Sequence, residues 1–236
     1  MVVKFLTSRE PRDILYRKVL IWVMGIGAAL IVSLLISKPK TVDFSSHLSE
    51  TAVTVDGEEI PLKTLGYYVM VTEENVDLLA SLYDPSDTFS FWRLHINTTF
   101  VVSAAKKGAM NTCIRDILYS NRAVELGISL DDDDEEKIMD EAADIEDGLS
   151  MKQRMATQLD AQSLVPILER VYLARKYAVK LSEEMDFTTE YGQSAGVALG
   201  VGGAYFEEAY EAADIKINEK LWKKVSLGNI TIGHYE

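Results

Sequence analysis

The feature that most constrains this chain is an uncharged apolar stretch near its N-terminus, residues 19–37 (VLIWVMGIGAALIVSLLIS). An α-helix rises about 1.5 Å per residue, so roughly 20 apolar residues are needed to cross the hydrocarbon core of a bilayer. A helix buried in a soluble domain is the alternative, but such a helix usually carries a polar face, and this stretch has none. The sequence therefore predicts a transmembrane anchor over residues 19–37.

Basic residues are distributed unequally on the two sides of this stretch. Five Lys or Arg precede it within residues 1–18, whereas only Lys38 and Lys40 follow closely. The cytoplasmic flanks of membrane helices are enriched in Lys and Arg, so we expect a cytoplasmic N-terminus and an extracytoplasmic C-terminal part. No small-residue cleavage site of the A-x-A kind follows the stretch, which favours an uncleaved, single-pass anchor.

The exported part is strongly acidic. The whole chain carries a net charge of −13, and residues 1–40 contain seven Lys/Arg and two Asp/Glu, a net of +5, which leaves −18 for residues 41–236. Such a domain repels nucleic acid and anionic lipid surfaces, so we expect no nucleic-acid partner. The acidic surface is either an ordinary solvated surface or one that attracts basic partners.

Cys113 is the only cysteine, so the chain cannot form an internal disulfide. Its neighbours Met110, Ile114 and Ile117 recur at helical spacing, which places the thiol on an apolar helix face. We therefore interpret Cys113 as a buried structural thiol rather than a nucleophile.

The first part of the exported chain combines a short linker, a hairpin and a helix. Residues 38–52 are polar and predict a stalk. The dipeptide Asp56-Gly57 lies between β-forming residues, which is typical of a tight hairpin turn. Pro61 then suits the first turn of a helix that continues to about Leu82.

A long helix is predicted from about residue 103 to Leu126, with Gly127 ending it. The acidic run over residues 131–136 lacks the alternating ligands and the glycine of a calcium loop. Because acidic residues offset the dipole at a helix N-terminus, we favour a capping role for this run over a metal site.

Further helices are expected over residues 150–159 and 163–185, with Ser163 as the N-cap and Pro166 in the first turn of the second. Residues 187–203 contain five glycines and predict a flexible connector. The closing region, 204–236, is expected to hold a last helix, a short strand over residues 214–218 and a second apolar alternation at residues 229–232.

Several short motifs occur in an order that resembles a known family. They are VTVDGEEI at 53–60, the pair Tyr67-Tyr68, AVELGISL at 123–130 before the acidic run, LERVYLARKY at 168–177 and IKINEKLW at 215–222. This order is similar to that of the N-terminal chaperone domain of SurA-like and PrsA-like foldases of the bacterial envelope. The resemblance implies a mostly α-helical chaperone-like domain over residues 53–186 with a small β element, held at a bacterial cell membrane.

Foldases of this kind commonly carry a parvulin-type prolyl isomerase domain between the last long helix and the closing segment. Here that interval is the glycine-rich connector, which is too short for such a domain. The resemblance therefore implies a non-catalytic protein that binds unfolded or exported polypeptides. A structural or adaptor subunit of an envelope complex and a divergent prolyl isomerase are the alternatives.

The sequence offers candidates for binding but not for catalysis. The three histidines are far apart, and no metal-binding or nucleophile motif accompanies them, so we expect neither a metal nor a cofactor. Aromatic and Met side chains provide adaptable apolar contacts for unfolded polypeptides. The candidate peptide-binding residues are Tyr67, Tyr68, Phe91, Trp92, Met151, Met155 and Tyr172.

Overall fold

The computed structural model of this chain describes residues 43–96 and 98–233. The predicted anchor over residues 19–37 lies outside the described residues, as do its flanks, residues 1–18 and 38–42. Within the described ranges, none of the helices has both the length and the apolar character that crossing a membrane requires.

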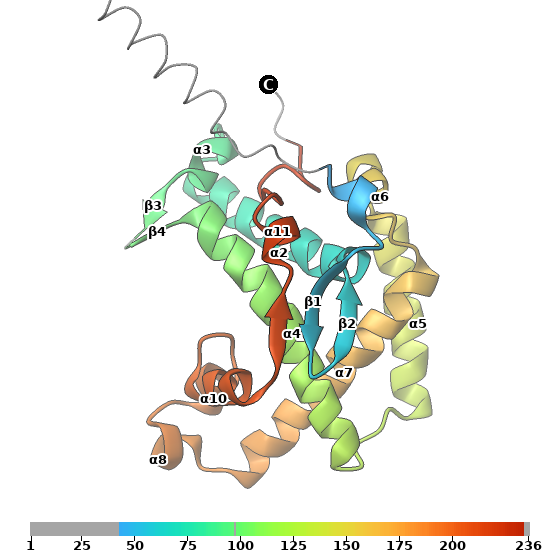
Figure 1. The fold of residues 1–236 in the computed structure, drawn as a ribbon, viewed down its shortest axis with the longest axis vertical. Coiled ribbons are helices and arrows are strands. Elements are labelled where there is room, and N and C mark those ends of the chain that lie inside the picture. The colour runs from blue at the N-terminus through green and yellow to red at the C-terminus, as the bar shows by residue number, and fades with distance from the viewer. Residues whose placement is uncertain (1–42, 97, 234–236) are drawn as a thin grey trace, which may run out of the picture. The chain divides into compact units, whose positions relative to one another are not determined.

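The described part of the chain is mostly helical and contains two small antiparallel sheets (Figure 1). This confirms the predicted mostly α-helical character with a small β element. The first half comprises η1 (Phe44–His47), β1 (Thr51–Val55), β2 (Glu58–Pro61), α2 (Leu62–Tyr83), α3 (Thr88–Trp92), β3 (His95–Ile96), β4 (Thr99–Phe100) and α4 (Val101–Glu125). The second half comprises α5 (Asp132–Gly148), α6 (Met151–Thr157), α7 (Ala161–Glu184), α8 (Phe187–Tyr191), α9 (Ala195–Ala198), α10 (Ala204–Ala212), β5 (Ile215–Ile217) and α11 (Glu219–Trp222).

The larger sheet joins the two ends of the described chain. Its strand order is β2-β1-β5, with β1 antiparallel to both neighbours. The predicted hairpin turn is confirmed, because Asp56 and Gly57 have φ angles of 48° and 87°, the left-handed values that a two-residue turn of this kind requires. Strand β5 confirms the strand predicted at residues 214–218, and it pairs with β1 across a long sequence separation.

Helices α2, α4, α5 and α7 pack around one main core. Cys113, Ile114 and Ile117 of α4 are fully buried there, so the predicted burial of the single thiol is confirmed. Two large apolar residues near the ends of these helices face away from the core. Leu79 on α2 and Val124 on α4 are exposed, although the adjacent Ala80 and Ala123 are fully buried, so both side chains lie on the outward face of their helices.

Capping side chains set the beginnings of the later helices. Asp131 caps α5 and forms a reciprocal capping box with Asp134, which confirms the capping role predicted for the acidic run. The predicted N-cap of the last long helix is wrong: Asp160 caps α7, and Ser163 is the third helical residue of the same capping box. As a consequence Pro166 lies in the second turn rather than the first, where the helix lacks one backbone hydrogen bond.

The predicted stalk is shorter than residues 38–52, because its described part belongs to the folded domain. Phe44 in η1 and Leu48 are buried in the main core. The ring of Phe44 lies directly beside Gly66 of α2, where an added Cβ would be 3.4 Å from the ring. Thr51 already begins strand β1.

The glycine-rich segment over residues 187–203 forms two short helices, α8 and α9, instead of the flexible connector that its composition predicted. Phe187, Ala198 and Leu199 are buried in a second apolar cluster together with Tyr119 of α4 and Tyr177 of α7. The aromatic and aliphatic side chains between the glycines therefore fix this segment against the long helices.

The end of the described chain is held by a buried carboxylate rather than by the strand pairing that an apolar alternation at residues 229–232 would suggest. Glu73 of α2 is fully buried. Its two oxygens accept hydrogen bonds from the backbone N–H groups of Gly228, Ile230 and Thr231 and from the hydroxyl of Thr231. The closing segment is thus docked onto α2.

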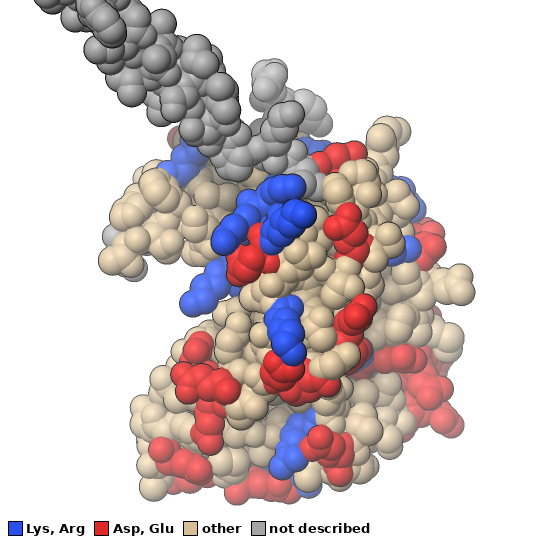
Figure 2. All heavy atoms as spheres, viewed as in Figure 1, with Lys and Arg blue, Asp and Glu red and all other residues tan. Residues whose placement is uncertain are grey.

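Charged residues are not evenly spread over this fold. Figure 2 shows Lys and Arg side chains gathered around α11 and near α3, in the upper half of the view, and Asp and Glu side chains over the lower half. The net charge of −18 therefore does not describe every face of the domain.

Candidate functional site

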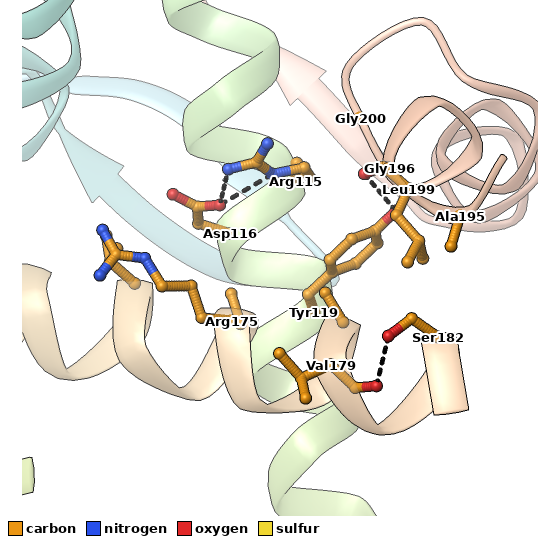
Figure 3. Close-up of a pocket in the computed structure, with 13 residues that line it drawn as sticks. Arg115, Asp116, Tyr119, Arg175, Val179, Ser182, Ala195, Gly196, Leu199 and Gly200 are labelled. Carbon is orange, nitrogen blue, oxygen red and sulfur yellow. Dashed lines mark hydrogen bonds and ion pairs between the residues drawn. The ribbon is translucent and has the colours of Figure 1, made fainter. Parts of the chain in front are cut away.

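A half-open groove of about 550 Å³ lies between α4, α7 and α9 (Figure 3). A volume of this size is typical of ligand-binding clefts. One wall is apolar, the opposite wall is the glycine-rich segment, and one end carries charged side chains. These three parts are described in turn, because each restricts what the groove can hold.

The apolar wall belongs to α7. The groove is lined by Val171 and by the residues three, seven and eight positions after it, Ala174, Ala178 and Val179, which share one face of the helix. Ser182 continues this face, but its hydroxyl donates to the backbone carbonyl of Val179, as Figure 3 shows. The wall therefore offers small aliphatic contacts.

Tyrosine side chains hold the opposite wall in place. The hydroxyl of Tyr119 donates to the backbone carbonyl of Leu199 at 3.1 Å, so α4 fixes the end of α9 (Figure 3). The hydroxyls of Tyr177 and Tyr205 are 2.5 Å apart and share a hydrogen bond. Burial raises the pKa of Tyr119 and of Tyr205, which keeps both phenols protonated as hydrogen-bond donors.

Two glycines in this wall are required by close packing. A Cβ on Gly203 would lie 1.9 Å from the backbone oxygen of Val197, a distance that no side chain can occupy. A Cβ on Gly200 would lie 3.1 Å from the backbone oxygen of Gly196. Gly196 itself is exposed and would meet nothing, although it lines the groove. The glycine content thus reflects a tight turn beside an open cavity.

The charged end contains an ion pair inside α4. Asp116 is buried, and Oδ1 of its carboxylate accepts hydrogen bonds from both Nε and Nη2 of Arg115, at 2.9 and 2.6 Å. Burial raises the pKa of Asp116, whereas the neighbouring guanidinium groups of Arg115 and Arg175 oppose that rise. The pair therefore places a fixed, partly exposed guanidinium at the groove.

Arg175 supplies a second cation at the same end, on the other side of Asp116 (Figure 3). Its guanidinium lies over the ring of Tyr172, 5.3 Å from the ring centre. Among residues 43–96 and 98–233, no acidic side chain lies within ion-pair distance of Arg175. The groove therefore ends at a guanidinium that is free to bind an anionic group.

A second apolar hollow of about 390 Å³ continues along α7 from this groove. It shares Arg175 and Val179 with the groove and is also lined by Ile128, Lys176, Lys180 and Glu183. The two hollows therefore adjoin along α7, and the apolar surface of the groove extends beyond the groove itself.

The seven residues predicted to bind peptide are not brought together in one place. Tyr68 and Trp92 are buried in the core, and Tyr67, Phe91 and Tyr172 are half-buried. Met151 and Met155 are exposed on α6, which is a different element from those lining the groove.

Tyr67, Tyr68 and Tyr172 nevertheless lie close to the charged end of the groove. Burial, followed by the charges of Glu141 and Asp116, raises the pKa of Tyr67 to about 12. Burial raises the pKa of Tyr68 well above its usual value. These tyrosines therefore remain neutral and form part of the surroundings of the arginine pair. The sequence gives no indication that Arg115 and Arg175 share a site, because only the packing of α4 against α7 brings them together.

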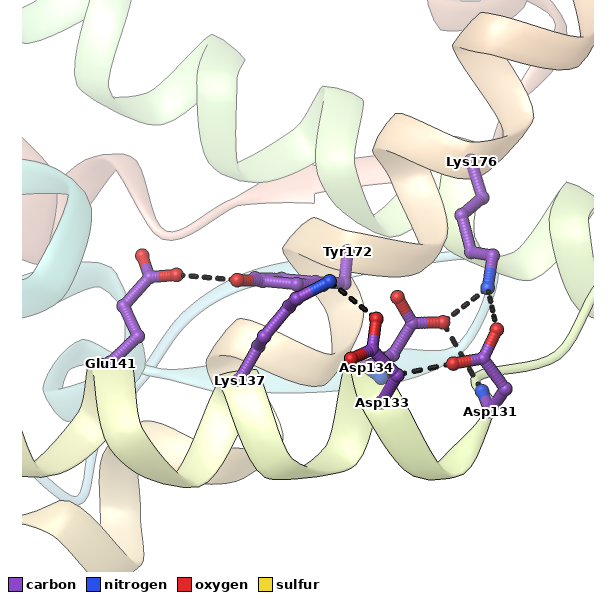
Figure 4. Close-up of polar contacts among 7 residues, drawn as sticks. All are labelled: Asp131, Asp133, Asp134, Lys137, Glu141, Tyr172 and Lys176. Atoms are coloured by element: carbon purple, nitrogen blue, oxygen red, sulfur yellow. Dashed lines mark hydrogen bonds and ion pairs between the residues drawn. The ribbon is translucent and has the colours of Figure 1, made fainter.

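The acidic run beyond α4 has a structural role that Figure 4 shows directly. Nζ of Lys176 contacts both Asp131 and Asp134, while Lys137 pairs with Asp133. Within the residues that the structure describes, no group of three or more acidic, His or Cys side chains is placed to hold a metal ion. The run therefore ties the start of α5 to α7.

Comparison of the chain with protein-family models, with curated proteins and with solved structures found no match.

Proposed function

We propose that this protein is a membrane-tethered, extracytoplasmic, chaperone-like protein that binds segments of unfolded or exported polypeptides in the groove between α4, α7 and α9. The groove is the observation that carries the proposal. It is apolar along one wall, open at the surface and continuous with a second apolar hollow. These are the properties of a site for extended, partly apolar chain segments.

The groove favours a particular kind of segment. Its apolar wall accepts small and medium aliphatic side chains, while Arg175 at one end attracts a carboxylate. Arginine binds carboxylates in a two-bonded arrangement that a lysine cannot reproduce. A client segment with aliphatic residues followed by Asp, Glu or a free C-terminus therefore satisfies both parts of the site.

The hydroxyl groups of the groove support binding rather than chemistry. Tyr119 and Ser182 donate to backbone carbonyls of Leu199 and Val179, so neither hydroxyl is directed at a base. Asp116 is held by Arg115. A nucleophile needs an adjacent base to activate it, and these contacts serve the fold instead.

The order of the sequence motifs and the predicted anchor lend further support. The resemblance to SurA-like and PrsA-like foldases predicts a client-binding domain at the outer face of a bacterial membrane. Tethering by residues 19–37 would raise the local concentration of the groove near chains that leave an export channel. Each single contact with a client is expected to be weak, because an unfolded segment loses conformational entropy when it is bound.

The test is to fill the groove without disturbing the fold. Gly196→Leu places a side chain in the groove at a position where an added Cβ meets nothing. Gly148→Leu is the matched control, because Gly148 is also exposed with nothing near its missing Cβ but lies at the end of α5. The full chain in detergent micelles is mixed with an unfolded client, and aggregation of the client is followed by light scattering.

We expect the wild type and Gly148→Leu to slow aggregation and Gly196→Leu to lose most of that effect. The charge preference is checked with Arg175→Met, which should weaken binding of a peptide ending in Glu but not of the same peptide with a C-terminal amide and Gln. Arg122→Met is its control, because Arg122 lies in the last turn of α4 and does not line the groove. If the wild type slows the aggregation of no client, or if both leucine variants behave alike, the proposal is wrong.

A crosslinking profile in cells separates this function from the adaptor alternative. Many substoichiometric partners are expected for a chaperone-like protein. A single stoichiometric membrane partner would instead indicate an adaptor subunit.

A further inference from the structure

A second surface of this domain combines exposed apolar side chains with basic ones, away from the groove. Leu82 and Tyr83 at the end of α2 are 76 % and 67 % exposed. Phe89 of α3 and the β3–β4 hairpin residues Ile96 and Phe100 are exposed as well. Large apolar side chains that gather on one surface usually mark an interaction site.

The contacts among these elements show that they form one surface. The ring of Tyr83 lies 5.5 Å from that of Phe91 in α3, and helix α2 packs against α3. The guanidinium of Arg93 lies 4.1 Å from the centre of the Phe89 ring. An arginine is thus already placed among the exposed aromatic residues.

Two segments of the domain carry more Lys and Arg than Asp and Glu. Residues 84–107 contain three Lys/Arg and two Asp, and residues 216–233 contain four Lys and one Glu, so together these segments carry +4. The net charge of residues 41–236 is −18, so the rest of the domain carries −22. A domain that is acidic as a whole therefore has a locally basic part.

The two basic segments are adjacent in the fold. Nζ of Lys106 donates to the backbone carbonyl of Val225 at 2.6 Å and lies 5.1 Å from the ring of Trp222 in α11. Trp92 of α3 packs directly against Gly228, where an added Cβ would be 2.9 Å from the indole. Figure 2 shows the resulting group of Lys and Arg side chains over α11 and beside α3.

We propose that this apolar–basic surface, formed by the end of α2, α3, the β3–β4 hairpin and α11, rests on the anionic lipid surface of the membrane that holds the anchor. The inference uses the predicted anchor but not the polypeptide-binding groove. Leu82, Tyr83 and Phe89 would enter the headgroup region, while Arg93, Lys107 and the lysines of residues 220–224 would contact lipid phosphates. Aromatic residues and Lys or Arg are the residue types enriched at membrane interfaces.

The length of the tether favours a lipid surface over other occupants. Residues 38–43 separate the end of the predicted anchor from Phe44, which is already buried in the core. Six residues span at most about 20 Å, so the domain cannot move far from the bilayer. The described chain begins at η1, which lies toward the same end of the longest axis as α3 (Figure 1). A surface at this end is therefore the one that the tether brings to the lipid.

The net negative charge does not prevent this contact. Electrostatic interactions between exposed charges are screened over about 8–10 Å at physiological salt, so the local charge near the lipid matters more than the charge of the distant acidic face. Orientation with the basic surface toward the membrane and the acidic face away from it is the arrangement that the charge asymmetry favours.

The test uses the full chain with a single fluorescent label. Leu82→Cys introduces an exposed thiol that can be labelled selectively. The native Cys113 does not compete for the label, because it is fully buried and burial raises the pKa of its thiol. Val124→Cys is the matched control: Val124 is also exposed, but it lies at the opposite end of α4 from the hairpin, about 35 Å along the helix. Both labelled proteins are reconstituted into phosphatidylglycerol or phosphatidylcholine vesicles that contain a lipid-borne quencher.

We expect the label at residue 82 to be quenched several times more strongly than the label at residue 124, and more in phosphatidylglycerol than in phosphatidylcholine. Neutralising Lys220 of α11 and Lys224, which follows α11, with Lys220→Gln and Lys224→Gln, should reduce the equilibrium constant for docking on phosphatidylglycerol by about fivefold per lysine. The control pair Lys137→Gln and Arg122→Gln, on α5 and near the C-terminal end of α4, should leave it unchanged.

Equal quenching at residues 82 and 124, or none at residue 82, would overturn the proposal. If the label at residue 82 is not quenched by the lipid but quenches itself more strongly as the protein density in the vesicles rises, the surface binds a second copy of the chain and the proposal is wrong. Loss of client binding in the groove variants would leave this result unaffected, so the two proposals fail independently.

Discussion

Replacing Glu73 tests whether a single buried carboxylate docks the closing segment of the domain. Its oxygens accept hydrogen bonds from the N–H groups of Gly228 at 2.5 Å, Ile230 at 3.2 Å and Thr231 at 2.6 Å, and from Oγ1 of Thr231 at 2.6 Å. Glu73→Ala leaves these four donors without an acceptor inside the fold. A buried donor without a partner costs about 1–3 kcal/mol, so the closing segment is expected to detach rather than remain unsatisfied.

The magnitude follows from what detachment exposes. Val225 and Leu227 are buried, and their exposure costs about 1.5–3 kcal/mol each. We therefore expect Glu73→Ala to lower the free energy of unfolding by about 3–5 kcal/mol, the range found when one partner of a buried charged contact is removed. Glu73→Gln keeps the shape and one acceptor oxygen, so a smaller loss of about 1–3 kcal/mol is expected.

The measurement is urea denaturation of the full chain in detergent micelles, followed by tryptophan fluorescence. Trp92 and Trp222 are buried near the closing segment and report on its release. Glu74→Ala is the control, because Glu74 is exposed and accepts a single hydrogen bond from Gln153. Amide hydrogen exchange over residues 225–233 should also accelerate in Glu73→Ala. A free energy of unfolding within about 1 kcal/mol of wild type would refute the docking role of Glu73.

Three further predictions concern the groove and the core. Gly203→Ala should destabilise the domain by about 2–3 kcal/mol in the same urea assay, because its Cβ would overlap the Val197 oxygen, whereas Gly196→Ala should lose no stability. Burial raises the pKa of Asp116, so its contribution to stability is complete below its usual pKa of 3.8 and is lost as the pH rises through the raised value. Asp116→Asn should therefore show a smaller fall in stability between pH 4 and neutral pH than wild type, and an unchanged pH profile would contradict this reasoning. The buried Cys113 should resist thiol reagents in the folded protein and react fully in urea, and rapid native labelling would show that the core opens.

The sequence by itself determined most of the local structure. The Asp56-Gly57 turn requires left-handed backbone angles that these residue types tolerate, and the acidic run at Asp131 matches the needs of a helix N-terminus. Cys113 was placed correctly because its neighbours repeat at helical spacing. These features depend on residues close in sequence, which is why pattern and composition predict them.

Composition gave wrong predictions for segments whose structure depends on residues distant in the sequence. Five glycines predicted a flexible connector, but Tyr119, Tyr177 and Phe187 hold residues 187–203 in two short helices. The polar stretch before Thr51 predicted a stalk, although Phe44 is buried beside Gly66. In both cases side chains from another element of the fold supply the apolar contacts.

Neither candidate site could be predicted from the sequence, because each is formed by residues that only the tertiary structure brings together. Arg115 and Arg175 are sixty residues apart and share one groove only because α4 packs against α7. The basic residues of segments 84–107 and 216–233 form one surface only because Lys106 and Trp92 contact the closing segment. Sequence fixes backbone preferences within a few residues, whereas the shape and charge of a surface depend on which helices lie side by side, and that is decided by burial across the whole chain.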